Sequence, residues 1–222
     1  MKNPLLYWLK VQASKFMRKE LISLYDAETI QQILSSYWQR YQRLKPEIPA
    51  IPSVGGSVMV HLAAKSAAFY HELTARSQSE ETSTKLFYAN AWKIYVKMGR
   101  LSWWLAGWGN RSSYGHLLKT TKLFRAFPFN SPSYEWKGVE TANNVVGLDC
   151  VRCPVAEYFQ SKGLAKSCTK TWCSLDYPLA ELWHAKLERN GSLAGGADKC
   201  DFLWTVKIEK PKDLLLLNEK KY

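Results

Sequence analysis

The chain's capacity for chemistry is concentrated in five cysteines, all in the last third of its 222 residues: Cys150, Cys153, Cys168, Cys173 and Cys200. A cysteine thiolate is a nucleophile and a metal ligand. A cytosolic chain keeps its thiols reduced, so we expect no disulfide among them. The clustering therefore indicates that the thiols pack together, bind a metal or take part in catalysis.

The segment WCSLDYP offers the first candidate pair, Cys173 and Asp176, which stand three residues apart. On a helical turn the two would share a face. A nearby carboxylate by itself raises a thiol's pKa, so a thiolate would need a further group. His184, eight residues beyond Asp176, is a candidate proton acceptor. The alternative is that Cys173 is a small buried apolar residue and Asp176 a helix N-cap.

A second candidate pair, Cys200 and Asp201, follows a glycine-rich turn in LAGGADKCDFLW. Gly195 and Gly196 predict a positive φ or a close approach of backbone to ligand. Consecutive strand residues face opposite sides, so only one of the pair can reach a given cavity. If Phe202 faces the core, Cys200 shares that face. Asp201 would then point to solvent or to a site on the other face.

The spacing of Cys150 and Cys153 raises the possibility of a zinc site, since Cys168 and Cys173 follow. A zinc knuckle places its paired cysteines in a turn, whereas Cys150 lies in a run typical of a strand. We therefore expect no metal and no other cofactor.

The hydrophobic period divides the chain into a helical region, 1–132, and a mixed region, 133–222, within one integrated domain. Three- and four-residue apolar spacing predicts helices in the first region: Lys19–Arg43, Ser57–Arg76, Lys85–Trp108 and Arg111–Phe129. The aromatic run LSWWLAGW within the third helix is expected to be core, although it could line an apolar pocket.

In the second region, β-branched and alternating residues predict strands around turns: Tyr134–Glu140, Asn144–Cys153 and two strands within Leu187–Ile208, with a helix over Pro154–Lys166 broken at Gly163. The expected fold class is α+β, with a helical N-terminal layer packed on a C-terminal antiparallel sheet.

The formal net charge of +12 raises the question of an acidic partner. The cations are spread along the chain and no nucleic-acid-binding motif is present, so we do not expect nucleic acid. An anionic small substrate or a membrane surface explains the charge as well. No apolar run is long enough to span a bilayer and no signal peptide is recognisable, so the expected location is the cytoplasm. Residues 4–17 have one apolar face that could lie on a membrane. The sequence does not indicate an oligomeric state.

Three segments together resemble the L-2-amino-thiazoline-4-carboxylic acid hydrolase family: Arg152-Cys153-Pro154, SCTKTWCSLDYPLAELW and LERNGSLAGGADKCDF. The resemblance covers about residues 134–207, and the upstream IPSVGGS also looks like that family. The positions that match in order are Cys153, Cys168, Cys173, Asp176, Cys200, Asp201 and Phe202. The end of the chain also looks like that of 4-vinyl reductase-type ligand-binding domains.

The resemblance implies hydrolytic opening of a thiazoline ring to an N-carbamoyl cysteine. Such a site needs a base or nucleophile, a proton source for the departing sulfur, and a cation for the substrate carboxylate. The catalytic candidates are Cys173, Asp176, Cys200, Asp201, Cys153 and His184. The candidates for substrate binding are Arg152, Glu188, Gly195, Gly196, Trp172 and Phe202, and Arg189 is a second possible receptor for a carboxylate. Glu188 could equally be a solvated strand residue.

A different class of function also fits the sequence. The Trp-rich helical half could hold an apolar ligand in a non-catalytic binding domain. An accessible thiol of low pKa would favour the enzyme, and its absence would favour the binding domain.

Overall fold

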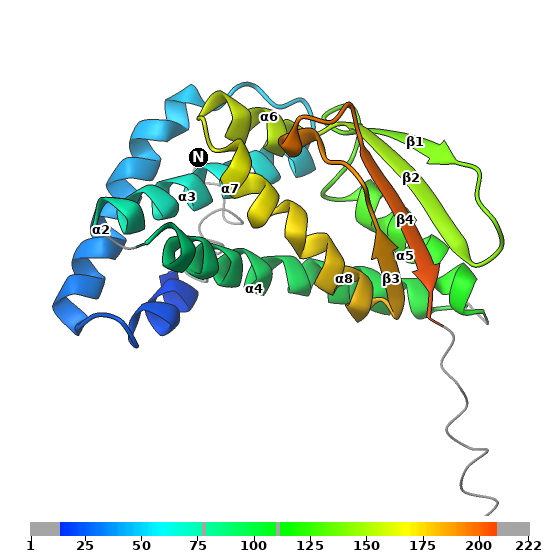
Figure 1. Cartoon of the computed structure of the whole chain (residues 1–222), viewed down its shortest axis with the longest axis horizontal. Coiled ribbons are helices and arrows are strands. Elements are labelled where there is room, and N and C mark those ends of the chain that lie inside the picture. Colours follow the sequence, from blue (N-terminus) through cyan, green and yellow to red (C-terminus); the bar gives the residue numbers. More distant parts are fainter. Residues whose placement is uncertain (1–13, 77–78, 110–111, 208–222) are drawn as a thin grey trace, which may run out of the picture.

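The computed structural model describes residues 14–76, 79–109 and 112–207. Its first half is built from four long helices: α2 (Ala27–Leu44), α3 (Val54–Ala75), α4 (Glu80–Gly107) and α5 (Ser113–Ala126). Its second half holds four strands and three short helices: β1 (Glu135–Val139), β2 (Val145–Arg152), α6 (Pro154–Ser161), α7 (Ala165–Lys170), α8 (Asp176–Leu182), β3 (Ala185–Glu188) and β4 (Cys200–Val206). The predicted α+β class, with a helical layer on an antiparallel sheet, is confirmed (Figure 1).

Side-chain caps set where the four long helices begin. Asp26 accepts a hydrogen bond from the backbone N–H of Thr29 at the start of α2. Serines do the same for the other three helices: Ser53 for α3, Ser79 for α4 and Ser112 for α5. Each cap satisfies one of the backbone donors that a first helical turn leaves without a partner.

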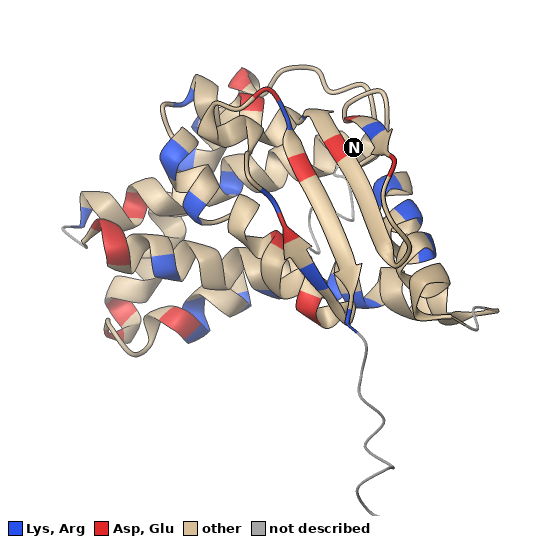
Figure 2. Cartoon of the chain, turned by 45° about the vertical axis from the view of Figure 1, so that its right-hand side comes forward, with Lys and Arg blue, Asp and Glu red and all other residues tan. Residues whose placement is uncertain are grey.

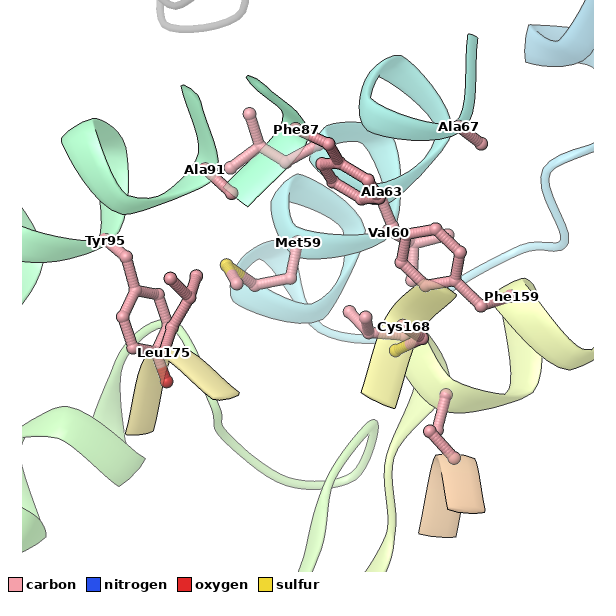
Figure 3. Close-up of a cluster of buried hydrophobic side chains, with 14 of the residues drawn as sticks. Met59, Val60, Ala63, Ala67, Phe87, Ala91, Tyr95, Phe159, Cys168 and Leu175 are labelled. Atoms are coloured by element: carbon pink, nitrogen blue, oxygen red, sulfur yellow. The ribbon is translucent and has the colours of Figure 1, made fainter. Parts of the chain in front are cut away.

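Helix α3 is the centre of the helical layer because small and apolar residues cover nearly all of its circumference. A helix that is apolar all round must be buried on all sides. Figure 3 shows Met59, Val60 and Ala63 of α3 between side chains of α4 on one side and Phe159 of α6 on the other. Helix α2 packs on α3 as well.

The start of α3 explains the sequence IPSVGGS. A side chain at Gly55 would place its Cβ 2.3 Å from the carbonyl oxygen of Pro128, and one at Gly56 would meet Ser133 at 2.5 Å. Ser53 and Ser133 join the two segments through a 2.7 Å hydroxyl–hydroxyl hydrogen bond. The glycines are needed because the backbone before β1 lies directly on the first turn of α3.

The sheet has the strand order β1-β2-β4-β3, and every neighbouring pair is antiparallel. One face is buried beneath the helices and the other carries polar residues, as antiparallel sheets commonly do. On β4, Cys200, Phe202 and Trp204 point inward and Asp201 points outward. The predicted shared face of Cys200 and Phe202 is therefore confirmed.

Two expectations about the helical half are wrong. Lys19–Arg43 is not one helix, because residues 14–21 are helical, a turn follows, and Asp26 starts α2 afresh. The run LSWWLAGW is not mainly core: Trp103 is half-buried, whereas Trp104 and Trp108 are exposed. The predicted break at Gly163 is confirmed by its φ of 67° between α6 and α7.

None of the described helices combines the length and the apolar character needed to cross a bilayer. The amphipathic segment 4–17 lies mostly outside the described residues, and so does the tail from residue 208.

Candidate active site

A cavity of about 90 Å³ lies between the inner face of the sheet and the helices that cover it. Tyr95 of α4 and Phe124 of α5 contribute to one wall, and Phe202 and Trp204 of β4 contribute to the opposite wall. All five cysteines line the cavity. Thiols that the sequence separates by up to 50 residues are thus brought to one place.

The five thiols form neither a disulfide nor a metal site in the described part of the chain. Each cysteine is free. No group of three or more described His, Cys, Asp or Glu side chains is arranged to hold a metal ion. The cysteines are therefore available either for packing or for thiol chemistry.

Cys173 differs from the other cysteines in its electrostatic surroundings. It begins the short 3-10 turn Cys173–Leu175 that leads into α8. A hydrogen bond from the Cys168 thiol, aided by the charge of Arg189 and by Ser192, lowers the pKa of Cys173, although burial and Asp176 oppose the shift. The pKa of Cys168 is raised well above its usual value because that thiol donates to Cys173 and is buried.

The remaining three thiols are held in the neutral form. Burial raises the pKa of Cys150 and of Cys153, and it raises the pKa of Cys200 to about 11. Cys200 also accepts a 3.2 Å hydrogen bond from the backbone N–H of Leu193. Because the thiolate is the nucleophile, Cys173 is the cysteine best suited to that role.

Asp176 and Arg189 form a buried ion pair beside Cys173. The Arg189 guanidinium donates to Asp176 Oδ2 at 2.7 Å and to the Cys173 carbonyl at 3.0 Å. Tyr95 donates to Asp176 Oδ1 at 2.7 Å. The Arg189 side chain is only 7% exposed and the Asp176 side chain only 15%. Burial raises the pKa of Asp176 although Arg189 and Tyr95 oppose the shift.

These bonds assign Asp176 a place in the cavity wall rather than at a helix cap. Leu175 occupies the N-cap position of α8, and no side chain caps that helix. The alternative in which Asp176 caps the helix is therefore wrong. Its carboxylate instead anchors Arg189, which in turn fixes the backbone of Cys173.

Asp201 lies on the opposite face of the sheet from the cavity. Its carboxylate accepts hydrogen bonds from the backbone N–H groups of Asn190 and Gly191, at 3.1 Å and 2.7 Å. Slight burial raises its pKa, but these hydrogen bonds outweigh burial, and the net pKa is lowered. Asp201 thus holds the turn between β3 and β4.

Four further candidates do not line the main cavity, although Arg152 and Gly196 line a separate surface hollow with Cys153. Arg152 is exposed and donates to Glu157. Glu188 is exposed and pairs with Lys186. His184 is exposed, has a φ of 50°, and lies beside Trp103 in another surface hollow. Gly196 has the expected positive φ, 91°.

Among the substrate-binding candidates, Trp172 and Phe202 do line the cavity. The guanidinium of Arg189 lies 5.3 Å from the centre of the Phe202 ring, within the range of a cation–π contact. Ala194 of the 3-10 turn Leu193–Gly195 lines the cavity, whereas Gly195, whose backbone N–H donates to Ser192 Oγ, does not. Leu193 of that turn contacts Cys200 through its backbone N–H.

Two polar residues of the cavity, Tyr134 and Arg125, were not predicted from the sequence. Tyr134 Oη, Arg125 Nε and Trp172 Nε1 are buried and have no hydrogen-bond partner among the described residues; Trp172 was singled out, but not for this atom. Buried polar groups are normally paired. No motif could have identified Tyr134 or Arg125, because α5 and the loop before β1 come into the site only through folding.

The protein has an α+β fold with a thiol-lined cavity between its sheet and its helices. A sequence profile of the L-2-amino-thiazoline-4-carboxylic acid hydrolase family matches residues 57–204, which is well over half of the chain. The chain belongs to this family. No curated protein and no solved structure matches it significantly. The family's name is that of a hydrolase with a small-molecule substrate.

Proposed function

We propose that the protein hydrolyses a small anionic heterocycle and opens a C–S bond of a thiazoline-type ring, with Cys173 as the nucleophile. The observation that carries the proposal is a cavity lined by five thiols, in which Cys173 lies beside the buried ion pair of Asp176 and Arg189. The surroundings lower the pKa of Cys173 and raise that of Cys168. The first is suited to attack, and the second is suited to hold and return a proton. The family's name supports the reaction class.

In the first step, the Cys173 thiolate adds to the ring carbon that lies between sulfur and nitrogen. The ring C–S bond breaks, and the departing sulfur takes the proton of Cys168. The substrate carbon is then bound to Cys173 as an isothiourea, and Cys168 is a thiolate. Arg189 stabilises the anionic sulfur before attack, because its charge already lowers the pKa of Cys173.

In the second step, a water molecule adds across the C=N bond of the isothiourea. The bond from carbon to Cys173 breaks, the hydroxyl becomes the carbonyl of a urea, and its proton returns to Cys168. Cys173 is released as a thiolate. Atoms and charge balance over the two steps: one ring and one water give one N-carbamoyl amino thiol.

The substrate's anionic group would bind Arg125 rather than Arg189. The two terminal nitrogens of the Arg189 guanidinium, Nη1 and Nη2, already donate to Asp176 and to the Cys173 carbonyl. Arg125 lines the cavity, and none of the described acidic side chains pairs with it. Burial lowers the pKa of Arg125, and an anionic ligand would relieve that penalty. Tyr134 Oη and Trp172 Nε1 could then pair with the polar edge of the ring.

The test is hydrolysis of 2-amino-thiazoline-4-carboxylate, followed by the appearance of a new thiol. Cys173→Ser is expected to lose at least about a thousandfold in turnover, as nucleophile variants do. Cys200→Ser is the matched control, because Cys200 is also buried and lines the cavity but is held neutral. Turnover that survives in Cys173→Ser would refute its role. A folded wild type without turnover would refute this substrate.

The second candidate is a non-catalytic domain that binds an apolar ligand. The aromatic rings of the cavity wall favour it, since Phe124, Phe129, Trp136 and Trp183 lie there beside β4. The two functions differ in covalent chemistry. A substrate-derived adduct on Cys173, detected by mass spectrometry after acid quench, is expected for the hydrolase and not for the binding domain.

A further inference from the structure

The C-terminal half of α4 places its small residues inward. Gly99, Ser102 and Ala106 are buried and face the rest of the fold. A side chain at Gly99 would bring its Cβ within 2.2 Å of Leu179 Cδ1, and Trp183 Nε1 donates to the Gly99 carbonyl at 3.0 Å. Helix α8 thus packs directly on the backbone of α4, and only small residues fit between them.

The opposite side of the same turns carries large apolar residues. We call Leu101, Trp104, Leu105 and Trp108 the α4 outer face; their spacing of three, four and seven residues puts them on one side of the helix. They are 56%, 59%, 42% and 72% exposed. The rings of Trp104 and Trp108 contact each other, with centroids 5.8 Å apart. A contiguous exposed apolar surface of this kind marks an interaction site.

Cations are frequent along α4 and α5, and the sequence of the two helices after Glu81 holds no acidic residue. From Thr82 to Tyr134 the sequence holds no Asp or Glu and eight Lys or Arg: Lys85, Lys93, Lys97, Arg100, Arg111, Lys119, Lys122 and Arg125. Arg100 and Lys122 are exposed, and Lys119 donates to the Trp108 carbonyl at 2.7 Å. Helices α4 and α5 pack side by side. Figure 2 shows Lys and Arg without Asp or Glu along α5, whereas both signs mix elsewhere.

We propose that the α4 outer face docks on the surface of an anionic lipid bilayer. Tryptophan prefers the boundary between headgroups and acyl chains, where its ring is apolar and its N–H stays polar. Leu101 and Leu105, on the same face as the two tryptophans, enter the acyl boundary beside them. Arg100, Lys119 and Lys122 meet lipid phosphates, as cations beside an interfacial helix do.

Charge complementarity favours this occupant over two others. A second copy of the chain would bring the same cations against one another, with no acid in either hairpin to offset the repulsion. Nucleic acid would pair with cations at the centre of the surface, whereas the centre here is Leu and Trp. An anionic bilayer accepts an apolar centre and neighbouring cations together.

The experiment is flotation of the purified protein with vesicles of phosphatidylcholine alone and with one third phosphatidylglycerol. The wild type is expected to float only with the anionic vesicles. Trp104→Ser/Trp108→Ser is expected to weaken partitioning about tenfold or more. Arg100→Gln/Lys122→Gln is expected to weaken it about 25-fold, from about fivefold for each cation lost. Brominated lipid should quench the wild type more than the tryptophan double variant.

Matched controls separate this surface from general stickiness and net charge. Ile22→Ser/Val54→Ser removes two apolar residues of similar exposure elsewhere, 70% and 73%. Arg43→Gln/Lys137→Gln removes two exposed cations elsewhere. Both controls are expected to float as the wild type does. The proposal is overturned if the wild type ignores anionic vesicles, if controls and test variants fall equally, or if only duplex DNA is bound.

Discussion

Cys168→Ala tests the electrostatic basis of the proposed nucleophile. The Cys168 hydrogen bond is the largest influence that lowers the pKa of Cys173, so its loss is expected to raise that pKa. A hydrogen bond to a charged group contributes about 1.5 kcal/mol at the lower end of its range. That free energy corresponds to about a tenfold smaller thiolate fraction at a fixed pH below the pKa. Alkylation of Cys173 by iodoacetamide should slow by the same factor.

The assay is the pH dependence of alkylation, with the modified residue located by mass spectrometry. In the wild type, Cys173 is expected to react first and at a lower pH than an ordinary thiol. Cys200→Ala is the control, because the neutral Cys200 thiol is not a hydrogen-bond partner of Cys173. An unchanged profile in Cys168→Ala would show that the thiol pair does not set the reactivity of Cys173. Earlier alkylation of Cys200 or Cys153 would refute the ranking of the thiols.

Two further predictions concern the arginines of the cavity. Arg189→Met leaves the Asp176 carboxylate buried without its cation, so the free energy of unfolding in urea should fall by about 3–5 kcal/mol. The double variant Arg189→Met/Asp176→Leu should recover most of that loss. If the effects of the two substitutions were simply additive, the ion pair would not be the cause of the loss. Arg125→Met should raise KM for the thiazoline carboxylate about 10- to 100-fold, with kcat much less affected. The same variant should leave KM unchanged for the analogue that lacks the carboxylate. Equal effects on both substrates would show that Arg125 does not bind the carboxylate.

The sequence predicted those features that depend on short-range patterns. Alternation along β4 correctly placed Cys200 with Phe202, and the Gly163 break and the strand–turn–strand region after α8 were found from turn residues. These features follow from backbone preference and from the two-residue period of a strand. The division of Lys19–Arg43 was missed because the apolar period continues through the turn, and only the Asp26 cap shows where α2 begins.

The composition of the site could not be read from the sequence, because the cavity is closed by distant segments. Asp176 and Asp201 each lie close to a cysteine in the sequence, and only strand alternation indicated that Asp201 faces away from Cys200. Folding gives Asp176 two partners in the cavity and gives Asp201 the backbone of an outer turn. Arg125 and Tyr134 stand in segments without any motif, and they matter only because α5 and the loop before β1 cover the inner face of the sheet.

Helix α4 shows how one element can serve the site and the surface at once. Tyr95, Gly99 and Ser102 follow each other at four and three residues, so they form the inner side that supports Asp176 and α8. Leu101, Trp104 and Trp108 follow the same period, displaced around the axis, and form the outer side. The large apolar residues of the α4 outer face are therefore not explained by the core. The small inner residues allow α8 to pack against α4. Packing within the fold does not require Trp104 and Trp108, so a partner outside the fold can account for them.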